Sequence, residues 1–232
     1  MSVAMATLLA ACGSKPPMRW VALPLPATPA HAASESSAAS PVLIVRRLHV
    51  PEYLQSASVR YRERDSVMAE WPDVRWADRI EVGLTEHLQM RLRQRLPGWT
   101  VCDRQCPADA AALTLNIDIA PLDYIRPART LQAQARWQLS WRDRASATPP
   151  DERPMPMPLP MTHRSQQAMQ TYALPVTRDD AEGQAEAMGR LLDELAQAVS
   201  TAVLTAAPQA PPSAPMPGAP PGQPPAAVRP MR

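Results

Sequence analysis

Two stretches of the chain alternate apolar and polar residues with a period of two, and they constrain the fold more than any other feature. Successive residues of a β-strand point to opposite faces, so each stretch predicts a strand with one buried and one wet face. The connection between them, 120–130, is long enough for an antiparallel hairpin. The apolar positions are Leu113, Leu115, Ile117 and Ile119 in the first stretch, and Ala133, Ala135, Trp137, Leu139 and Trp141 in the second.

Two amphipathic helices are predicted to cover this sheet. The first spans about 76–95, with Asp73 as its N-cap and Pro97-Gly98 as its stop. The second spans about 178–205 and opens with a capping box at 177–180. Steps of three and four gather the apolar residues on one face of each helix. These residues are Trp76, Ala77, Ile80, Leu84, Leu88, Leu92 and Leu96 in the first helix, and Ala181, Ala185, Met188, Leu191, Leu192, Leu195, Val199 and Val203 in the second.

Shorter elements complete the predicted layout. Strands are expected at 42–50, at 99–101 and at 165–173, and a hairpin at 58–62 and 66–71. Pro51 ends the first of these strands, and the turn after it is expected to anchor Tyr53 and Leu54. The pattern therefore predicts an α+β fold, in which two amphipathic helices pack on one face of a mostly antiparallel sheet.

The first residues have the features of a bacterial lipoprotein signal. Residues 4–11 are apolar but far too few to cross a bilayer, and Leu9-Ala10-Ala11-Cys12 has the form of a lipobox. We therefore expect a signal peptide at 1–11 and lipid attachment to the thiol of Cys12. The alternative is an ordinary signal peptide with a chance cysteine, and the absence of Lys or Arg before Cys12 departs from the usual pattern. Gly13, where an Asp retains many lipoproteins at the inner membrane, favours the outer membrane.

Composition divides the remaining chain into three parts. Residues 12–40 are rich in Ala, Ser and Pro and are expected to form a flexible, lipidated tether. Residues 41–205 are the predicted periplasmic domain, interrupted by a surface excursion at 149–160 that contains six prolines. Residues 206–232 are expected to be a disordered, proline-rich tail.

Cys102 and Cys106 form an even pair once Cys12 is lipidated. An exported chain enters an oxidising compartment, which favours a structural disulfide between them. Two free thiols are an alternative. A metal or redox site is another, although a Cys-x3-Cys pair without nearby histidine is a poor metal site.

Catalytic motifs are missing from the sequence. It has no G-x-S-x-G elbow, no P-loop and no H-E-x-x-H, so we expect no enzyme activity and no cofactor. The four histidines are scattered, and His87 is expected to pack beside the apolar face of the first helix. The net charge of +2 does not favour a nucleic acid as partner. Arg46-Arg47 and Arg60, Arg62 and Arg64 make a basic stretch, which is either a solvated strand face or a basic patch for lipid headgroups or an acidic partner.

Several short segments together resemble the PqiC-like family of ABC-type transport auxiliary lipoproteins. They are the lipobox, the VLIV strand leading to Pro51-Glu52-Tyr53-Leu54, the segment that starts at Trp76-Ala77, the Leu84 and Leu88 spacing, and Ala133-Gln134-Ala135-Arg136-Trp137. The resemblance covers about 41–205. It marks Pro51, Tyr53, Leu54, Trp76 and Ala77 as candidate partner or structural residues. The chain departs from the pattern in its lack of phenylalanine and in its proline-rich insert and tail.

The resemblance also implies a function. Proteins of this family are non-catalytic outer-membrane lipoproteins that face the periplasm and work with an inner-membrane MCE-domain protein to move lipids and maintain the envelope. It implies docking of the transporter at the outer membrane, with homo-oligomers and contact with phospholipid as further expectations. The alternative is another envelope-assembly or secretion pilot lipoprotein that binds an outer-membrane partner.

Overall fold

The structure is a computed structural model that describes residues 16–26, 40–103, 112–142 and 163–206. It contains two helices, α1 (Ile80–Arg95) and α2 (Ala181–Ala206). A short 3-10 helix covers Glu52–Leu54. Eight strands form one sheet: β1 (Arg19–Val21), β2 (Val42–Val45), β3 (Ser58–Arg64), β4 (Val67–Trp76), β5 (Thr100–Cys102), β6 (Ala112–Ile125), β7 (Thr130–Arg142) and β8 (His163–Pro175).

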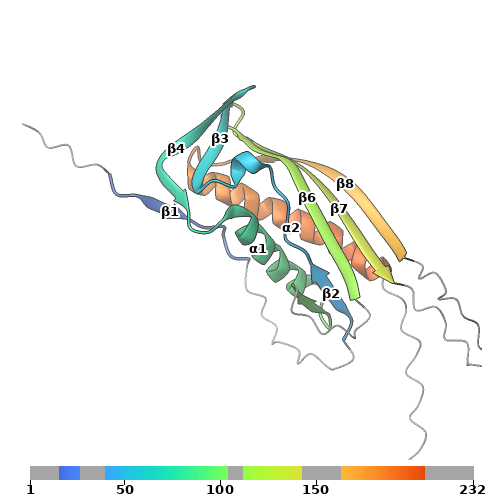
Figure 1. Ribbon diagram of the computed structural model, residues 1–232. Coiled ribbons are helices and arrows are strands. Elements are labelled where there is room, and N and C mark those ends of the chain that lie inside the picture. Colours follow the sequence, from blue (N-terminus) through green and yellow to red (C-terminus); the bar gives the residue numbers. More distant parts are fainter. Residues whose placement is uncertain (1–15, 27–39, 104–111, 143–162, 207–232) are drawn as a thin grey trace, which may run out of the picture.

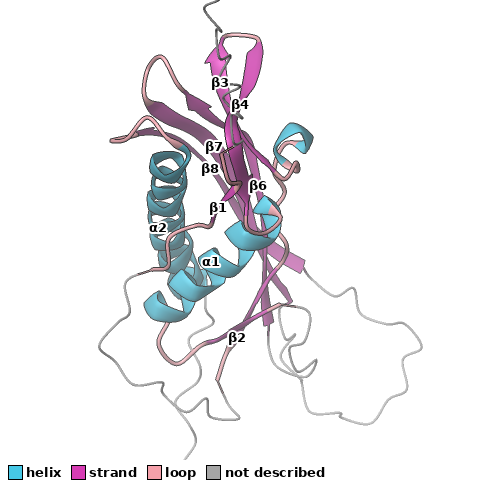
Figure 2. Ribbon diagram, turned by 90° about the vertical axis from the view of Figure 1, so that its left-hand side faces the viewer, coloured by secondary structure: helices cyan, strands magenta, loops and turns pink. Residues whose placement is uncertain are grey.

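Both helices lie on the same face of the sheet, as the α+β prediction requires (Figures 1 and 2). The sheet is mixed. Its three longest pairings, β6–β7, β7–β8 and β3–β4, are antiparallel, and the shorter pairings β1–β4, β2–β5, β2–β6 and β3–β6 are parallel. One hydrophobic core between the helices and the sheet joins residues from all these elements. None of the described helices is long and apolar enough to span a membrane.

The predicted alternating strands are confirmed as β6 and β7, but they are longer than expected. All the apolar positions from Leu113 to Ile119 are buried on the helix side. The pairing then continues through the segment predicted as a connection, with a register shift between Ile119 and Leu122. Pro121, which follows a cis peptide bond, interrupts the alternation of apolar and polar residues on which the strand prediction rests. After this interruption the strand continues, and Tyr124 is again buried in the core. The true turn is only 126–129.

The first helix begins later than predicted. It starts at Ile80, and its N-cap is Arg79. Asp73, expected as the N-cap, instead lies in β4 with a positive φ of 55°. Trp76 closes the same strand, where its N–H donates to the carbonyl of Ala57 at 2.8 Å. Pairing of β4 with strands on both sides thus overrides the helical spacing of this segment. The apolar stripe from Ile80 to Leu96 is buried as expected.

The second helix also starts a little later than predicted. Asp180 is the residue that caps it, because its carboxylate Oδ1 accepts a 2.7 Å hydrogen bond from the N–H of Gly183. The expected capping box at Thr177 is therefore displaced by three residues. The predicted apolar face from Ala181 to Val203 is buried against the sheet.

Part of the predicted tether belongs to the folded domain. Residues 16–26 were expected within the flexible segment 12–40, yet β1 pairs in parallel with β4, and Val21 and Leu23 are buried. Pro24 packs so closely on α2 that a Cβ at Gly189 would lie 2.7 Å from its Cγ. Two buried residues spaced by two are too short a pattern to predict a strand, which is why composition alone gave the wrong answer.

Candidate functional site

The predicted motif residues Pro51, Tyr53 and Leu54 fix the 3-10 helix to the sheet. Leu54 is buried, and the Tyr53 hydroxyl donates a 2.7 Å hydrogen bond to Oδ1 of Asp123. Burial first, and then the bond to Asp123, raise the pKa of Tyr53 to about 12. Arg62 donates to the other oxygen of Asp123 at 2.9 Å from Nε. The geometry gives these residues a structural role.

Trp76 and Ala77 hold the N-terminal segment in place. The Trp76 side chain is buried in the core. Ala77 is exposed, and its N–H donates to the carbonyl of Val21 at 2.8 Å. His87, expected as a packed histidine, lies half-buried with Nδ1 3.2 Å from the carbonyl oxygen of Pro24. Burial lowers the pKa of His87, which favours its neutral form.

A cluster of partnered polar groups joins the first turns of α2 to the sheet. The guanidinium of Arg126 lies 4.5 Å from the ring centroid of Trp71, and its Nε donates to Asp179 at 3.1 Å. The Tyr124 hydroxyl donates to the same carboxylate at 2.9 Å. The Trp71 indole N–H donates to the side-chain oxygen of Gln184 at 3.0 Å. We call this cluster of Trp71, Tyr124, Arg126, Asp179 and Gln184 the polar joint.

Three arginines of the predicted basic stretch lie in the hairpin of β3 and β4, near carboxylates. Arg60 pairs with Glu70 at 2.9 Å and Arg62 with Asp123, while Arg64 is 4.0 Å from Glu63. The charges of Arg60 and Arg62 are therefore compensated within the domain. The solvated-strand interpretation of this stretch fits the structure better than the basic patch.

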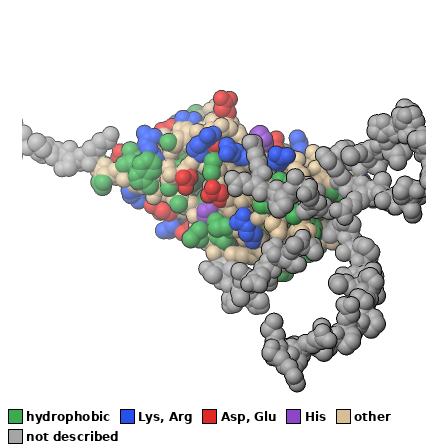
Figure 3. All heavy atoms as spheres, turned by 60° about the horizontal axis from the view of Figure 1, so that its bottom comes forward, with side chains coloured by type: hydrophobic (Ala, Val, Ile, Leu, Met, Phe, Trp, Pro, Cys, Tyr) green, Lys and Arg blue, Asp and Glu red, His purple; other side chains and the backbone are tan. Residues whose placement is uncertain are grey.

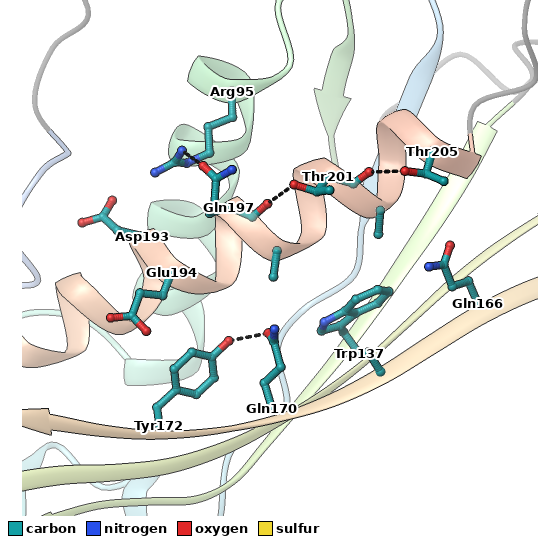
Figure 4. A pocket seen from close by; sticks show the side chains of 13 residues that line it. Arg95, Trp137, Gln166, Gln170, Tyr172, Asp193, Glu194, Gln197, Thr201 and Thr205 are labelled. Atoms are coloured by element: carbon teal, nitrogen blue, oxygen red, sulfur yellow. Dashed lines mark hydrogen bonds between the residues drawn. The ribbon is translucent and has the colours of Figure 1, made fainter.

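A groove lies between the C-terminal half of α2 and strands β7 and β8, with a volume of about 750 Å³ (Figure 4). Trp137 forms part of its floor, and its indole Nε1 is buried without a hydrogen-bond partner among the described residues. Beside it, the Tyr172 hydroxyl donates to the side-chain oxygen of Gln170 at 2.7 Å. Burial and the charge of Glu194 raise the pKa of Tyr172 to about 12. The neutral, hydrogen-bonding tyrosine and the unpaired indole N–H make this groove the candidate binding site.

Metal-binding side chains of the described residues do not converge in the groove. In the described ranges, no three His, Cys, Asp or Glu side chains are placed to hold a metal ion. Asp193 on the groove's rim is bonded to Arg91 at 2.7 Å, and Arg95 bonds to Gln197. The groove can hold a ligand by shape, by its indole donor and by the exposed carboxylate of Glu194.

Comparison with known proteins identifies the family of the chain. A sequence model of the family described as "ABC-type transport auxiliary lipoprotein component" matches residues 22–200. The chain belongs to this family. That result confirms the PqiC-like resemblance, and the match begins at residue 22, within the segment that the sequence assigned to the tether. No curated protein matches the sequence significantly.

Solved structures share the fold of this auxiliary lipoprotein. A crystal structure of an uncharacterized protein aligns with a TM-score of 0.58 at 15% identity, covering 81% of this chain and 99% of the other. The protein XCC0632 from Xanthomonas campestris aligns with a TM-score of 0.52 at 15% identity, covering 80% of this chain and 95% of the other. At this identity the likeness concerns the fold.

Two of the predicted site cysteines, Cys12 and Cys106, lie outside the described residues. Cys12 and the signal peptide lie outside them, so lipid attachment stays a prediction. Cys102, at the end of β5, is disulfide-bonded. Cys106 lies outside the described residues, so the pairing of these two cysteines also stays a prediction.

The groove of this auxiliary lipoprotein was missed by the sequence analysis. The alternation that includes Trp137 correctly predicted a buried strand face. That pattern does not show that α2 leaves the indole N–H unpaired, because the missing hydrogen bond depends on where the helix crosses the assembled sheet. An aromatic residue with a polar atom at a predicted core position was the only available signal.

Proposed function

We propose that the protein is a non-catalytic subunit of an MCE-type lipid transport system, anchored to the outer membrane through a lipid on Cys12. Its domain faces the periplasm and docks the MCE-domain protein of the inner membrane. Homo-oligomerisation and contact with phospholipid stay predictions within this proposal. Family membership over residues 22–200 is the observation that carries it.

The ordered N-terminal segment supports a short anchor. Only six residues lie between Cys12 and Arg19, the first residue of β1, so seven Cα–Cα steps join the two. A fully extended chain of that length spans at most about 25 Å. A lipid on Cys12 therefore keeps the domain close to the membrane surface, instead of on the long tether that the composition suggested.

The surface near β1 suits this position. Hydrophobic side chains gather at the end of the molecule where the chain enters β1 (Figure 3). Met18 is 41% exposed and Trp20 is 64% exposed. Tryptophan is enriched at membrane–water interfaces, where its ring lies at the level of the lipid headgroups. These side chains can contact the headgroup region while the lipid holds the chain there.

The anchor is tested by separating membranes from soluble protein in cells that express the full chain. We expect the wild-type protein in the outer-membrane fraction after salt and carbonate washes, and the Cys12→Ala protein outside it. Ser14→Ala, next to the lipobox, is the control and should behave as wild type. A Cys12→Ala protein that stays membrane-bound would show that the anchor is wrong.

The partner is tested by cross-linking in intact cells, followed by affinity purification and mass spectrometry. Recovery of an MCE-domain protein supports the proposal. Recovery of a β-barrel protein without any MCE-domain protein would contradict it and favour a pilot lipoprotein instead. The Cys12→Ala strain serves as a control, because loss of the anchor should reduce recovery of a partner that is rooted in the other membrane.

A further inference from the structure

Strand β8 forms an edge of the sheet. Among the described residues it pairs only with β7, in a register of thirteen residues without any irregularity. Natural edge strands are usually protected against strand addition by charges, prolines or bulges. Residues 165–174 of β8 contain no charged residue and no proline, and Met169 is 58% exposed. This edge is therefore open to pairing with another strand.

The hydrogen-bond pattern shows which backbone groups face outward. The N–H of Val176 donates to the carbonyl of Arg129 at 2.7 Å, so this position is a hydrogen-bonded pair. Such pairs alternate along an antiparallel ladder, and the residues between them point their N–H and C=O groups to the other side. By this alternation the outward-facing residues of β8 are Ser165, Gln167, Met169, Thr171 and Ala173.

The groove lies directly beside this edge. Its wall on β8 consists of the intervening residues Gln166, Ala168, Gln170 and Tyr172, whose side chains face α2. The opposite wall runs along α2 from Asp193 to Thr205, which corresponds to about 18 Å of helix. Five residues of an added strand would span about 17 Å. The edge and the groove thus match one another in length and direction (Figure 4).

We propose that the free edge of β8 and the groove beneath α2 form one binding site for an extended segment of another polypeptide. The segment adds as a strand to β8, and its side chains on the helix side fill the groove. This inference rests on the proposed function: the segment belongs to the periplasmic part of the MCE-domain partner.

Three features define the chemistry of that segment. It needs about five successive residues without proline, so that its own N–H groups can pair with the carbonyls of β8. One groove-facing residue carries an oxygen that accepts from Trp137 Nε1. A basic residue lies near the exposed carboxylate of Glu194. The chain's own residues 207–232 do not fit, since they contain ten prolines and no proline-free run longer than four residues.

The test measures binding of the full chain, in detergent, to the purified periplasmic part of the MCE-domain protein and to overlapping 15-residue peptides from it. Met169→Pro removes one outward N–H without changing a bond to β7, and Met169→Ala is the matched control. Trp137→Phe removes the indole donor, and Trp141→Phe on the same strand is its control. We expect about tenfold weaker binding for Met169→Pro, a smaller loss for Trp137→Phe, and near wild-type binding for both controls.

Each other outcome overturns the inference. Equal binding by Met169→Pro and Met169→Ala would show that the edge is not used, while the proposed function would stand. No binding of the MCE-domain protein by the wild-type chain would remove both. A wild-type dimer that Met169→Pro makes monomeric would identify a second copy as the occupant. If Met169→Pro does not fold, Thr171→Pro replaces it, with circular dichroism as the check.

Discussion

Helix α2 meets the sheet at two places that differ in how their polar groups are satisfied. Near its N-terminus, in the polar joint, Gln184 accepts from the Trp71 indole and donates to the carbonyl of Arg60 at 2.8 Å. Near its C-terminus the Trp137 side chain is more deeply buried than that of Trp71, yet its indole N–H has no partner in the described chain. A buried donor without a partner destabilises a fold. The comparison suggests that the polar joint maintains the structure and that the groove is kept for a ligand.

The largest effect is expected at Asp123, which precedes Tyr124 of the polar joint on β6 and is itself fully partnered. Asp123→Ala leaves the Tyr53 hydroxyl and the Arg62 guanidinium without their shared carboxylate. We expect a loss of about 3 kcal/mol in the free energy of unfolding, measured with denaturant. Asp118→Ala, an exposed aspartate on the same strand, is the control and should change stability by less than about 0.5 kcal/mol. Equal effects of the two substitutions would contradict a structural role for the bonds of Asp123.

The N-terminal segment provides the next test, between the two places on α2. Gly189→Ala brings a Cβ to 2.7 Å from Pro24 Cγ, so residues 22–26 must shift. We expect a loss of about 1–2 kcal/mol and faster proteolysis near Pro24. Gly83→Ala is the matched control, because its Cβ would make an ordinary 3.6 Å contact with Leu23. Unchanged proteolysis of Gly189→Ala would mean that the segment does not rest on α2.

Replacing each of the two tryptophans by phenylalanine compares the stability contributions of a paired and an unpaired indole N–H. Trp71→Phe leaves the side-chain oxygen of buried Gln184 without its donor, and we expect a loss of about 1–2 kcal/mol. Trp137→Phe removes a donor that is already unpaired, so its cost should be below about 1 kcal/mol. Thermal and denaturant unfolding measure both. A larger loss for Trp137→Phe would argue against an open groove.

The smallest effect concerns a pKa in the groove. The folded pKa of Tyr172, about 12, lies above its usual value of 10.0. The neutral tyrosine therefore contributes stability that is complete below pH 10 and is lost as the pH rises from about 10 to 12. Glu194→Gln should lower this pKa without restoring the usual value, because burial is the larger cause. Ultraviolet titration against Tyr172→Phe measures it, and an unchanged pKa would show that Glu194 does not face Tyr172.

The sequence predicted what depends on local pattern. Alternation located β6 and β7, a further strand was expected at 165–173 where β8 lies, and the apolar stripes located α1 and α2. It failed where pairing between distant segments decides the structure. Trp76 has helical spacing but ends a strand, because β4 is paired on both sides. Val21 and Leu23 lie in a segment with the composition of a linker, but their burial against α1 and β4 orders it. The edge position of β8 and the open side of Trp137 depend on the assembled sheet.

Hydrogen–deuterium exchange on the full chain, alone and with the periplasmic part of the MCE-domain protein, measures strand addition at β8 amide by amide. We expect slower exchange at the outward amides of β8, among them those of Gln167, Met169 and Thr171, and no change in the polar joint. Protection confined to the hairpin of β3 and β4, or no protection in β8, would contradict strand addition at β8.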